Sequence, residues 1–288
     1  MRVRATWLLV SVCLLAGLAA LMLLDRHANE PQYQGRPLSY WLLQAEATLS
    51  PDLAQAALNE AGTNAVPHLL KWIQYEPPRW RKKLVHNRLG TFLRPLTHTR
   101  QESLAVASCN DFPMLGTNAF AAIPKLVMLI HNTNAPLTAV WALHALGRLG
   151  TNGLLPIISA MQDPRYAFRF PAVAAIASGG QQPASLPTIT PVLVQCLKDV
   201  TDLRIPEMAA MSLGNNAYAP DLSIPALTNC LASPDPILRS VAAGSLAHFA
   251  GQATDALPIL TQALADTDPR VRNAATNAIT AITMAPRE

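Results

Sequence analysis

A spacing of about 33 residues recurs along the chain and constrains its fold more than any other feature. Pro124, Pro156, Pro191, Pro225 and Pro258 mark it, since their positions differ by 32, 35, 34 and 33. A fixed period of this length fits a helix, a turn and a second helix, and it is typical of stacked helical hairpins rather than of one globular core. We therefore predict an all-α fold, an α-α superhelix of about six hairpins.

The clearest unit shows how such a repeat begins. Asp-Pro pairs stand at 235–236 and 268–269, one period apart. Aspartate suits the N-cap of a helix, and proline suits the first helical position, where no amide donor is needed. An arginine follows each aspartate by four positions. We expect these residues to be structural and to tie successive repeats together as a ladder, which consists of Asp235, Arg239, Asp268, Arg272 and Arg169.

The repeat unit resembles the HEAT repeat, in the short bacterial form associated with phycobilisome-lyase-like proteins. The motif that carries the resemblance is Asp-Pro-x-x-Arg-x-x-Ala-Ala at 235–243, with related versions at 163–175 and 268–275. The resemblance implies a solenoid that acts by binding. The segment 33–42 also resembles the start of exported bacterial HEAT-repeat proteins.

Several units depart from this pattern. Those at 62–70 and 116–119 are predicted to keep only the turn and the second helix. Pro206 and Ala139 stand where other units have the ladder arginine. The ladder is therefore expected to be interrupted at these two positions.

Small residues are expected to shape the helices and their packing. Gly150, Gly214 and Gly251 follow apolar helical stretches and are predicted to end those helices. Cys196 and Cys230 occupy matching positions of two units, and the next unit has alanine there. A position that accepts both residues is expected to hold a small side chain buried between helices. Helices buried on two sides also explain why only 14% of the residues are charged.

The N-terminus predicts a membrane anchor. Residues Ala5 to Leu24 are uncharged and predominantly apolar, which is long enough for a helix to cross a bilayer. Arg2 and Arg4 precede this run, so the positive-inside rule places the N-terminus in the cytoplasm and the rest of the chain on the exported side. The predicted organisation is an anchor at 1–25, a linker at 26–38 and a HEAT-like solenoid at 39–288.

A cleaved signal peptide is the alternative for this segment. Gly17-Leu18-Ala19 is a small-x-small triplet of the kind that signal peptidase recognises. The apolar run continues past the triplet to Leu24, which favours an anchor. Cleavage would make the protein secreted.

A basic insertion at 77–108 interrupts the period, because Pro67 and Pro124 are separated by well over one period and by less than two. Between positions 79 and 100 the chain has seven lysines and arginines and no acidic residue. The formal charge of +4 is therefore a local feature, since the remaining residues sum to −3. Insertions in solenoids often map to the binding face. The candidate partner-binding residues are Arg79, Trp80, Arg81, Lys82, Lys83 and Arg88.

Three roles fit this insertion. It could bind a protein partner or an anionic polymer, with Trp80 as an aromatic anchor among cations. It could contact anionic lipid head groups, because the tether would keep it near the membrane. It could also be a solvated helical face without a partner, which is a common fate of charge runs. Nucleic acid is not an expected partner of an exported domain.

No motif in the sequence indicates catalysis. The histidines are scattered singly, and there is no Cys-x-x-Cys or His-x-x-x-His spacing, no nucleophile elbow and no phosphate-binding glycine loop. We therefore assign no catalytic, cofactor-binding or metal-binding residue and expect no cofactor. The predicted function is a non-catalytic scaffold for an unidentified protein partner. The alternatives are a lyase-like enzyme or enzyme accessory on the same fold, and a structural envelope protein.

Overall fold

The computed structural model describes residues 29–78, 99–163, 165–179 and 183–285. The predicted anchor at 1–25 and the six candidate partner-binding residues between Arg79 and Arg88 lie outside these ranges. The fold below concerns the described residues alone.

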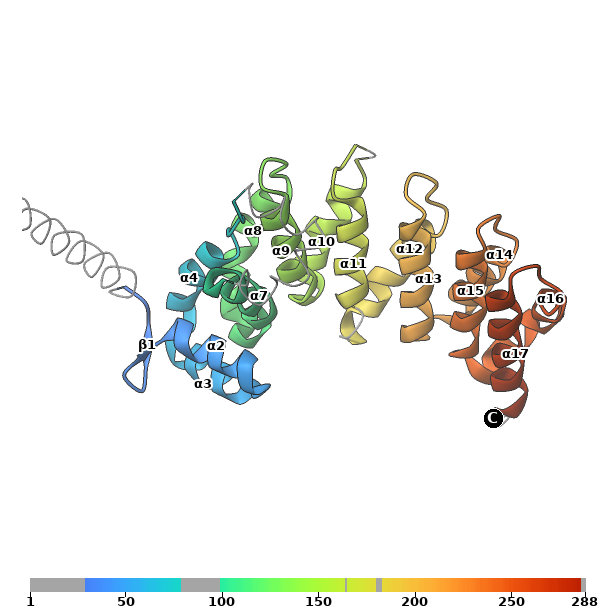
Figure 1. Cartoon of the computed structure of the whole chain (residues 1–288), viewed down its shortest axis with the longest axis horizontal. Helices are drawn as coiled ribbons and strands as arrows, with labels where there is room; N and C mark the ends of the chain where they lie inside the picture. Colours follow the sequence, from blue (N-terminus) through green and yellow to red (C-terminus); the bar gives the residue numbers. More distant parts are fainter. Residues whose placement is uncertain (1–28, 79–98, 164, 180–182, 286–288) are drawn as a thin grey trace, which may run out of the picture.

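The helices form two stacked rows that follow an arch (Figure 1). In the A row, each helix contacts the next one along the chain. The B row lies beside it and contains the second helix of each pair. The A row consists of α2 (Leu38–Thr48), α7 (Arg100–Asp111), α9 (Pro136–Gly147), α11 (Arg169–Gly179), α13 (Arg204–Asn216), α15 (Pro236–Ala247) and α17 (Pro269–Met284). The B row consists of α4 (Val66–Trp72), α8 (Ile123–Ile130), α10 (Gly150–Met161), α12 (Leu186–Cys196), α14 (Pro220–Cys230) and α16 (Leu257–Ala263).

The remaining elements are short or lie at the N-terminal end. Helix α3 (Pro51–Ala61) packs against α2. The predicted all-α superhelix is confirmed for the described residues, with one small addition inside the predicted linker. There, β1 (Gln32–Tyr33) and β2 (Arg36–Pro37) form an antiparallel pair in which Tyr33 faces Arg36. Within the described ranges there are also four 3-10 segments: η1 (Gly62–Ala65), η2 (Phe112–Ala122), η3 (Pro183–Ser185) and η4 (Ala250–Ala256).

Neighbouring A-row helices approach so closely that a side chain would not fit at two positions. A methyl group on Gly147 of α9 would lie 2.4 Å from the carbonyl oxygen of Ala175 in α11. A methyl group on Gly214 of α13 would lie 2.6 Å from the Cβ of Ser245 in α15. The Ser245 hydroxyl donates a 2.8 Å hydrogen bond to the carbonyl of Ala210, which joins the same two helices. Small residues therefore set the spacing of the A row.

This close approach corrects one prediction about glycine. Gly150 has a left-handed φ of 64°, but it is the first residue of α10, three positions after α9 ends at Gly147. Gly214 does not end a helix, because α13 continues to Asn216 and the glycine serves helix packing instead. At the third predicted helix end, the residue in the left-handed conformation is Ala250, which directly precedes Gly251 and has a φ of 49°.

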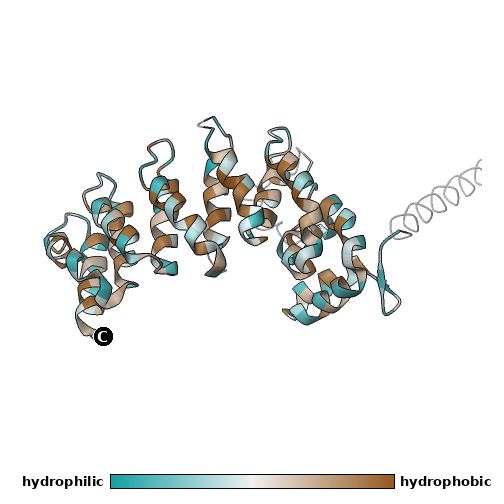
Figure 2. Cartoon of the chain, turned by 180° about the vertical axis from the view of Figure 1, so that it is seen from behind, coloured by the Kyte–Doolittle hydropathy of each residue, from teal (hydrophilic) through white to brown (hydrophobic). Residues whose placement is uncertain are grey.

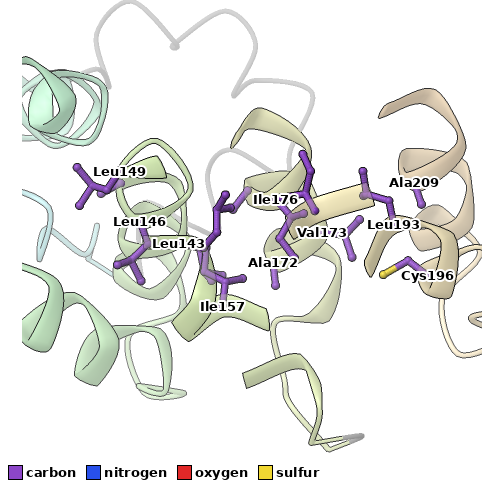
Figure 3. Packing of buried hydrophobic residues seen from close by; sticks show 14 of the residues in the cluster. Leu143, Leu146, Leu149, Ile157, Ala172, Val173, Ile176, Leu193, Cys196 and Ala209 are labelled. Atoms are coloured by element: carbon purple, nitrogen blue, oxygen red, sulfur yellow. The ribbon is translucent and has the colours of Figure 1, made fainter. Parts of the chain in front are cut away.

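A continuous apolar core runs between the two rows. Figure 3 shows part of it, in which Leu143 of α9, Ile157 of α10 and Ile176 of α11 are buried together with Leu193 of α12. Each repeat thus completes the core of its neighbours, as expected of a solenoid. In Figure 2 the hydrophobic colour is concentrated on the helices, and the loops between them are largely hydrophilic. The three cysteines of the described chain, Cys109, Cys196 and Cys230, are free and buried in this core.

The insertion ends earlier than the predicted range of 77–108. Residues from Arg100 onward belong to α7, a full A-row helix. The prediction failed here because α7 has no Asp-Pro start: its N-cap is Thr99, whose hydroxyl accepts a 3.3 Å hydrogen bond from the amide of Glu102. The unit at 116–119 therefore has a first helix, and α3 likewise precedes the unit at 62–70.

One helical run of the described chain, Arg100–Ile130, is long and apolar enough to span a membrane by length and composition. The left-handed φ of 56° at Gly116 divides this run into α7 and α8. Helix α7 packs against α2, α4 and α9, and α8 packs against α9. These contacts place both halves inside the repeat array.

We predict that the substitution Gly147→Ala destabilises the fold by about 1–3 kcal/mol, because the new methyl group would collide with the backbone of α11. Thermal or urea unfolding followed by circular dichroism measures the effect. Gly244→Ala is the matched control, since this helical glycine has nothing within 4 Å of an added Cβ. There, alanine should stabilise the protein by about 0.5–1 kcal/mol. Equal effects at the two positions would contradict close packing of the A row.

Candidate functional surface

The loops that join one helix pair to the next lie along a single edge of the array. Figure 1 shows them on the upper, convex side of the arch. Each A-row helix begins at this edge, so equivalent positions of successive repeats lie side by side. We call this surface the loop edge. It comprises the described residues of these loops and the first residues of the helices that follow, at 131–136, 162–163, 165–169, 197–204, 231–237 and 264–270.

Aspartate side chains accept hydrogen bonds from backbone amides in these loops. Asp235 caps α15 by accepting a hydrogen bond of 3.0 Å from the amide of Ile237, and Asp268 caps α17 with one of 2.8 Å from the amide of Arg270. Asp163 and Asp202 accept equivalent bonds from the residues two positions later. At α15 and α17 these bonds satisfy amides at the start of the helix and so restrain the ends of the two preceding loops.

Three of the loops carry the same exposed ion pair. The pairs Asp163–Arg165, Asp202–Arg204 and Asp268–Arg270 all have the form Asp-x-Arg. The hydrogen bond from Arg270 is the main cause that holds the pKa of Asp268 down, at about 2. In the fourth loop Ile237 occupies the position of the arginine, and its side chain is exposed. The loop edge therefore presents exposed guanidinium groups at Arg165, Arg204 and Arg270 and the apolar Ile237 between the last two.

A second set of arginines ties the loops to one another. Arg239 binds both carboxylate oxygens of Asp266 at 2.8 Å and donates to the carbonyls of Ser233 and Pro234. Side-chain exposures of 14% and 13% make this a mostly buried pair. The hydrogen bond from Arg239 also lowers the pKa of Asp266.

The other two ladder arginines bind in a similar way. Arg169 pairs with Asp199 and donates to the carbonyl of Met161. Arg272 donates to the carbonyls of Asp266 and Thr267. The Arg169–Asp199 pair joins two neighbouring loops, whereas the bonds of Arg272 hold the loop that precedes its own helix.

The connection that contains the basic insertion starts and ends at the loop edge. The Thr99 hydroxyl donates to the Tyr75 hydroxyl over 3.3 Å, so the two flanks of the insertion meet. Glu76 accepts a 2.8 Å hydrogen bond from the amide of Thr138 at the start of α9. The six candidate residues lie between these flanks in the sequence and outside the described residues. The two described flanks, Tyr75 and Thr99, therefore lie at the same edge as the other loops.

Exposed apolar side chains also gather on this edge. Val200 and Leu203, in the loop between α12 and α13, are 88% and 58% exposed. Ile237, in the first turn of α15, and Leu264, in the loop before α17, are also exposed. Large apolar side chains in water mark a surface that suits a protein partner when they recur together. Sequence reasoning did not identify these residues, because an apolar residue in a loop gives no periodic signal.

A groove of about 380 Å³ opens beside the loop edge between α10 and α12. Its apolar part comes from Ile158, Met161 and Val192, and the Arg169–Asp199 pair forms part of its polar wall. Burial raises the pKa of Cys196, which also lines the groove, to about 11, so this residue is a thiol at neutral pH. The remaining lining residues are Gln162, Gln195 and Lys198.

A second pocket, of about 260 Å³, lies at the far end of α7 from the loop edge. Asp111, the last residue of α7, lines it and is only 8% exposed. Burial is the main cause that raises the pKa of Asp111 to about 7, and the nearby Glu46 adds to the rise while Arg148 opposes it. No spacing in the sequence singled out Asp111, since its neighbours come from other helices.

Neither pocket gathers the groups that a lyase-like site would need. Cys109 and His144 both lie near Arg148, but neither lines the pocket beside Asp111. Burial raises the pKa of Cys109 to about 12, and burial and Arg148 lower the pKa of His144. Within the described ranges, no three His, Cys, Asp or Glu side chains are placed to hold a metal ion.

We predict that Arg239→Ala loosens the C-terminal repeats, because it removes the bidentate pair with Asp266 and two bonds to loop carbonyls. Hydrogen exchange of the α17 amides should become at least about tenfold faster. Arg270→Ala is the control, because that arginine forms an exposed pair within its own loop. Similar exchange in both variants would contradict a tying role for Arg239.

We predict a pH-dependent gain in stability from Asp111→Asn. Because the folded-state pKa of Asp111 is raised to about 7, ionisation costs folding free energy that grows as pH rises from about 4 to 7. The variant should therefore match the parent chain near pH 4 and exceed it at pH 8. Urea unfolding at both pH values measures the difference. If the variant and the parent chain differed in unfolding free energy by the same amount at both pH values, the pKa of Asp111 would not be raised in the folded state.

Comparisons with known proteins agree with the observed repeats. The family described as HEAT repeats matches residues 154–247 and 224–287. Two crystal structures of engineered proteins are similar in outline. One is 18% identical with a TM-score of 0.46 over 85% of this chain and 96% of its own, and the other is 22% identical with a TM-score of 0.45 over 88% and 69%. No protein of curated function matches the chain. Residues 154–287 therefore match the HEAT-repeat family.

Proposed function

We propose that this protein is a non-catalytic scaffold whose loop edge binds a protein partner. The observation that carries the proposal is the row of rigid loops with exposed Arg165, Arg204 and Arg270 and, among them, exposed Val200 and Leu203. Arginine and apolar side chains are both favoured in the cores of protein interfaces. A stack of repeats places these groups at a regular spacing, which suits an extended partner.

The rigidity of the loops favours binding. The caps at Asp235 and Asp268 and the pair between Arg239 and Asp266 hold the backbone before any partner arrives. Ordering a flexible loop would cost free energy on association, and preorganisation avoids that cost. The adjacent groove between α10 and α12 offers space for a side chain of the partner.

The basic insertion adds an electrostatic component to the same surface. Its flanks, Tyr75 and Thr99, meet at the loop edge. The proposal therefore joins Arg79, Trp80, Arg81, Lys82, Lys83 and Arg88 with the exposed loop residues as one binding surface. An anionic lipid head group or anionic polymer is the other chemistry that this cationic segment would accept.

A membrane tether on the exported side completes the proposal. The uncharged run from Ala5 to Leu24 and the preceding Arg2 and Arg4 support it. The tether would hold the solenoid close to the membrane and raise the local concentration of membrane-bound partners.

The test is crosslinking and affinity recovery of the full chain from native membranes. The first variant reverses the charges between Arg79 and Arg88, and the second carries Val200→Asp with Leu203→Asp. We expect both to lose the partner. Leu155→Asp is the control: this exposed leucine lies in α10, outside the loop edge, and its change should keep recovery intact. Unchanged recovery in the two surface variants would refute the proposal. Recovery of the chain's own copies alone would favour a structural envelope protein.

The tether has its own measurement. The mature protein should be found in the membrane fraction with residues 1–25 intact. An N-terminus near Ala20 would show that the segment is a cleaved signal peptide and would refute the tether.

A further inference from the structure

The pocket at the far end of α7 contains a buried carboxylate that no neighbour neutralises by a hydrogen bond. Asp111 is 8% exposed and lines the pocket. Its charged neighbours act on it at a distance: Glu46 of α2 and Arg148, which follows α9. Among the residues that the structure describes, none donates a hydrogen bond to the Asp111 carboxylate.

Such a carboxylate is costly to keep. Burying an ion without a partner is unfavourable, and proteins normally pair a buried charge or neutralise it. Asp111 is also the last residue of α7, where the carbonyl end of the helix dipole disfavours a negative charge. Glu46 adds a second negative charge nearby. A cation that entered the pocket would relieve all three unfavourable contributions at once.

The rest of the pocket suits an alkyl chain. Leu42 and Leu49 of the α2 region, Pro51 and Ala54 of α3, and Met114 supply apolar walls. The volume of about 260 Å³ equals the space of roughly nine water molecules at about 30 Å³ each. The remaining lining residues are Ala45, Glu46, Ala107, Asn110 and Asp111.

Arg148 does not provide the cation that would form a hydrogen bond with the Asp111 carboxylate. It lowers the pKa of Asp111 through space only, and Arg148 has interactions of its own. The nearby titratable groups on α7 and α9 add no cation: burial keeps the Cys109 thiol protonated, and it keeps the His144 imidazole neutral near pH 7. Among the described residues, Asp111 therefore accepts no hydrogen bond from a cation.

We propose that this pocket binds a lysine or arginine side chain of a protein partner, with its alkyl stem between the apolar walls and its cationic head group on Asp111. A charged donor would form a charge-assisted hydrogen bond with the carboxylate, the strongest kind available to it. The site is separate from the loop edge, because α7 with 12 residues spans about 18 Å. It adds a second contact point and does not depend on the loop-edge proposal.

The experiment uses the full chain in detergent and two small probes, n-butylammonium and the neutral n-butanol. Ligand-detected NMR measures saturable binding at pH 8.0 and pH 5.5. We expect n-butylammonium to bind at pH 8.0 at least about tenfold more tightly than n-butanol, since only the cation meets the carboxylate. Binding should weaken at pH 5.5, where Asp111 is protonated.

Two variants assign the binding to the pocket. Asp111→Asn keeps the size of the side chain and should abolish the preference for n-butylammonium, with folding checked by circular dichroism. Asp52→Asn, an exposed carboxylate on neighbouring α3, should leave binding unchanged. Absence of saturable binding at pH 8.0, equal binding of both probes, or undiminished binding by Asp111→Asn would each overturn the proposal. None of these outcomes bears on partner recovery through the loop edge.

Discussion

The close approach of successive A-row helices is the contact on which the remaining structure depends. Gly147 and Gly214 remove the side chain where two backbones meet, and Ser245 adds a hydrogen bond across one of these contacts. Because each A-row helix packs against the next, the helix starts line up along one edge (Figure 1). The loop edge is thus a consequence of helix packing in the core, and a change at a buried glycine would move residues on the surface.

The polar groups of the loop edge do two separate jobs. Buried members such as Arg239 and Asp266 satisfy loop carbonyls and hold neighbouring repeats together. Exposed members such as Arg165 and Arg204 face solvent and contribute little to stability, as is usual for surface ion pairs. The buried set therefore leaves the exposed set free to meet a partner without a loss of folding free energy.

The N-terminal end of the array departs from the regular repeat. The connection between α4 and α7 is enlarged, and α3 packs beside α2. The same region contains Asp111, a carboxylate that folding leaves without a hydrogen-bonding partner among the described residues. Selection for stability alone would remove such a group. Its presence in a pocket therefore favours a role in binding.

The sequence by itself determined the fold class, because a period of about 33 residues with Asp-Pro starts allows few alternatives to stacked helical hairpins. It also located the basic insertion, although Thr99 in place of an Asp-Pro start concealed where α7 begins. Only the tertiary structure decided the function of Gly214, the alignment of the loops and the isolation of Asp111. Each of these depends on contacts between residues of different helices, and a distance between separate elements leaves no local pattern in a sequence.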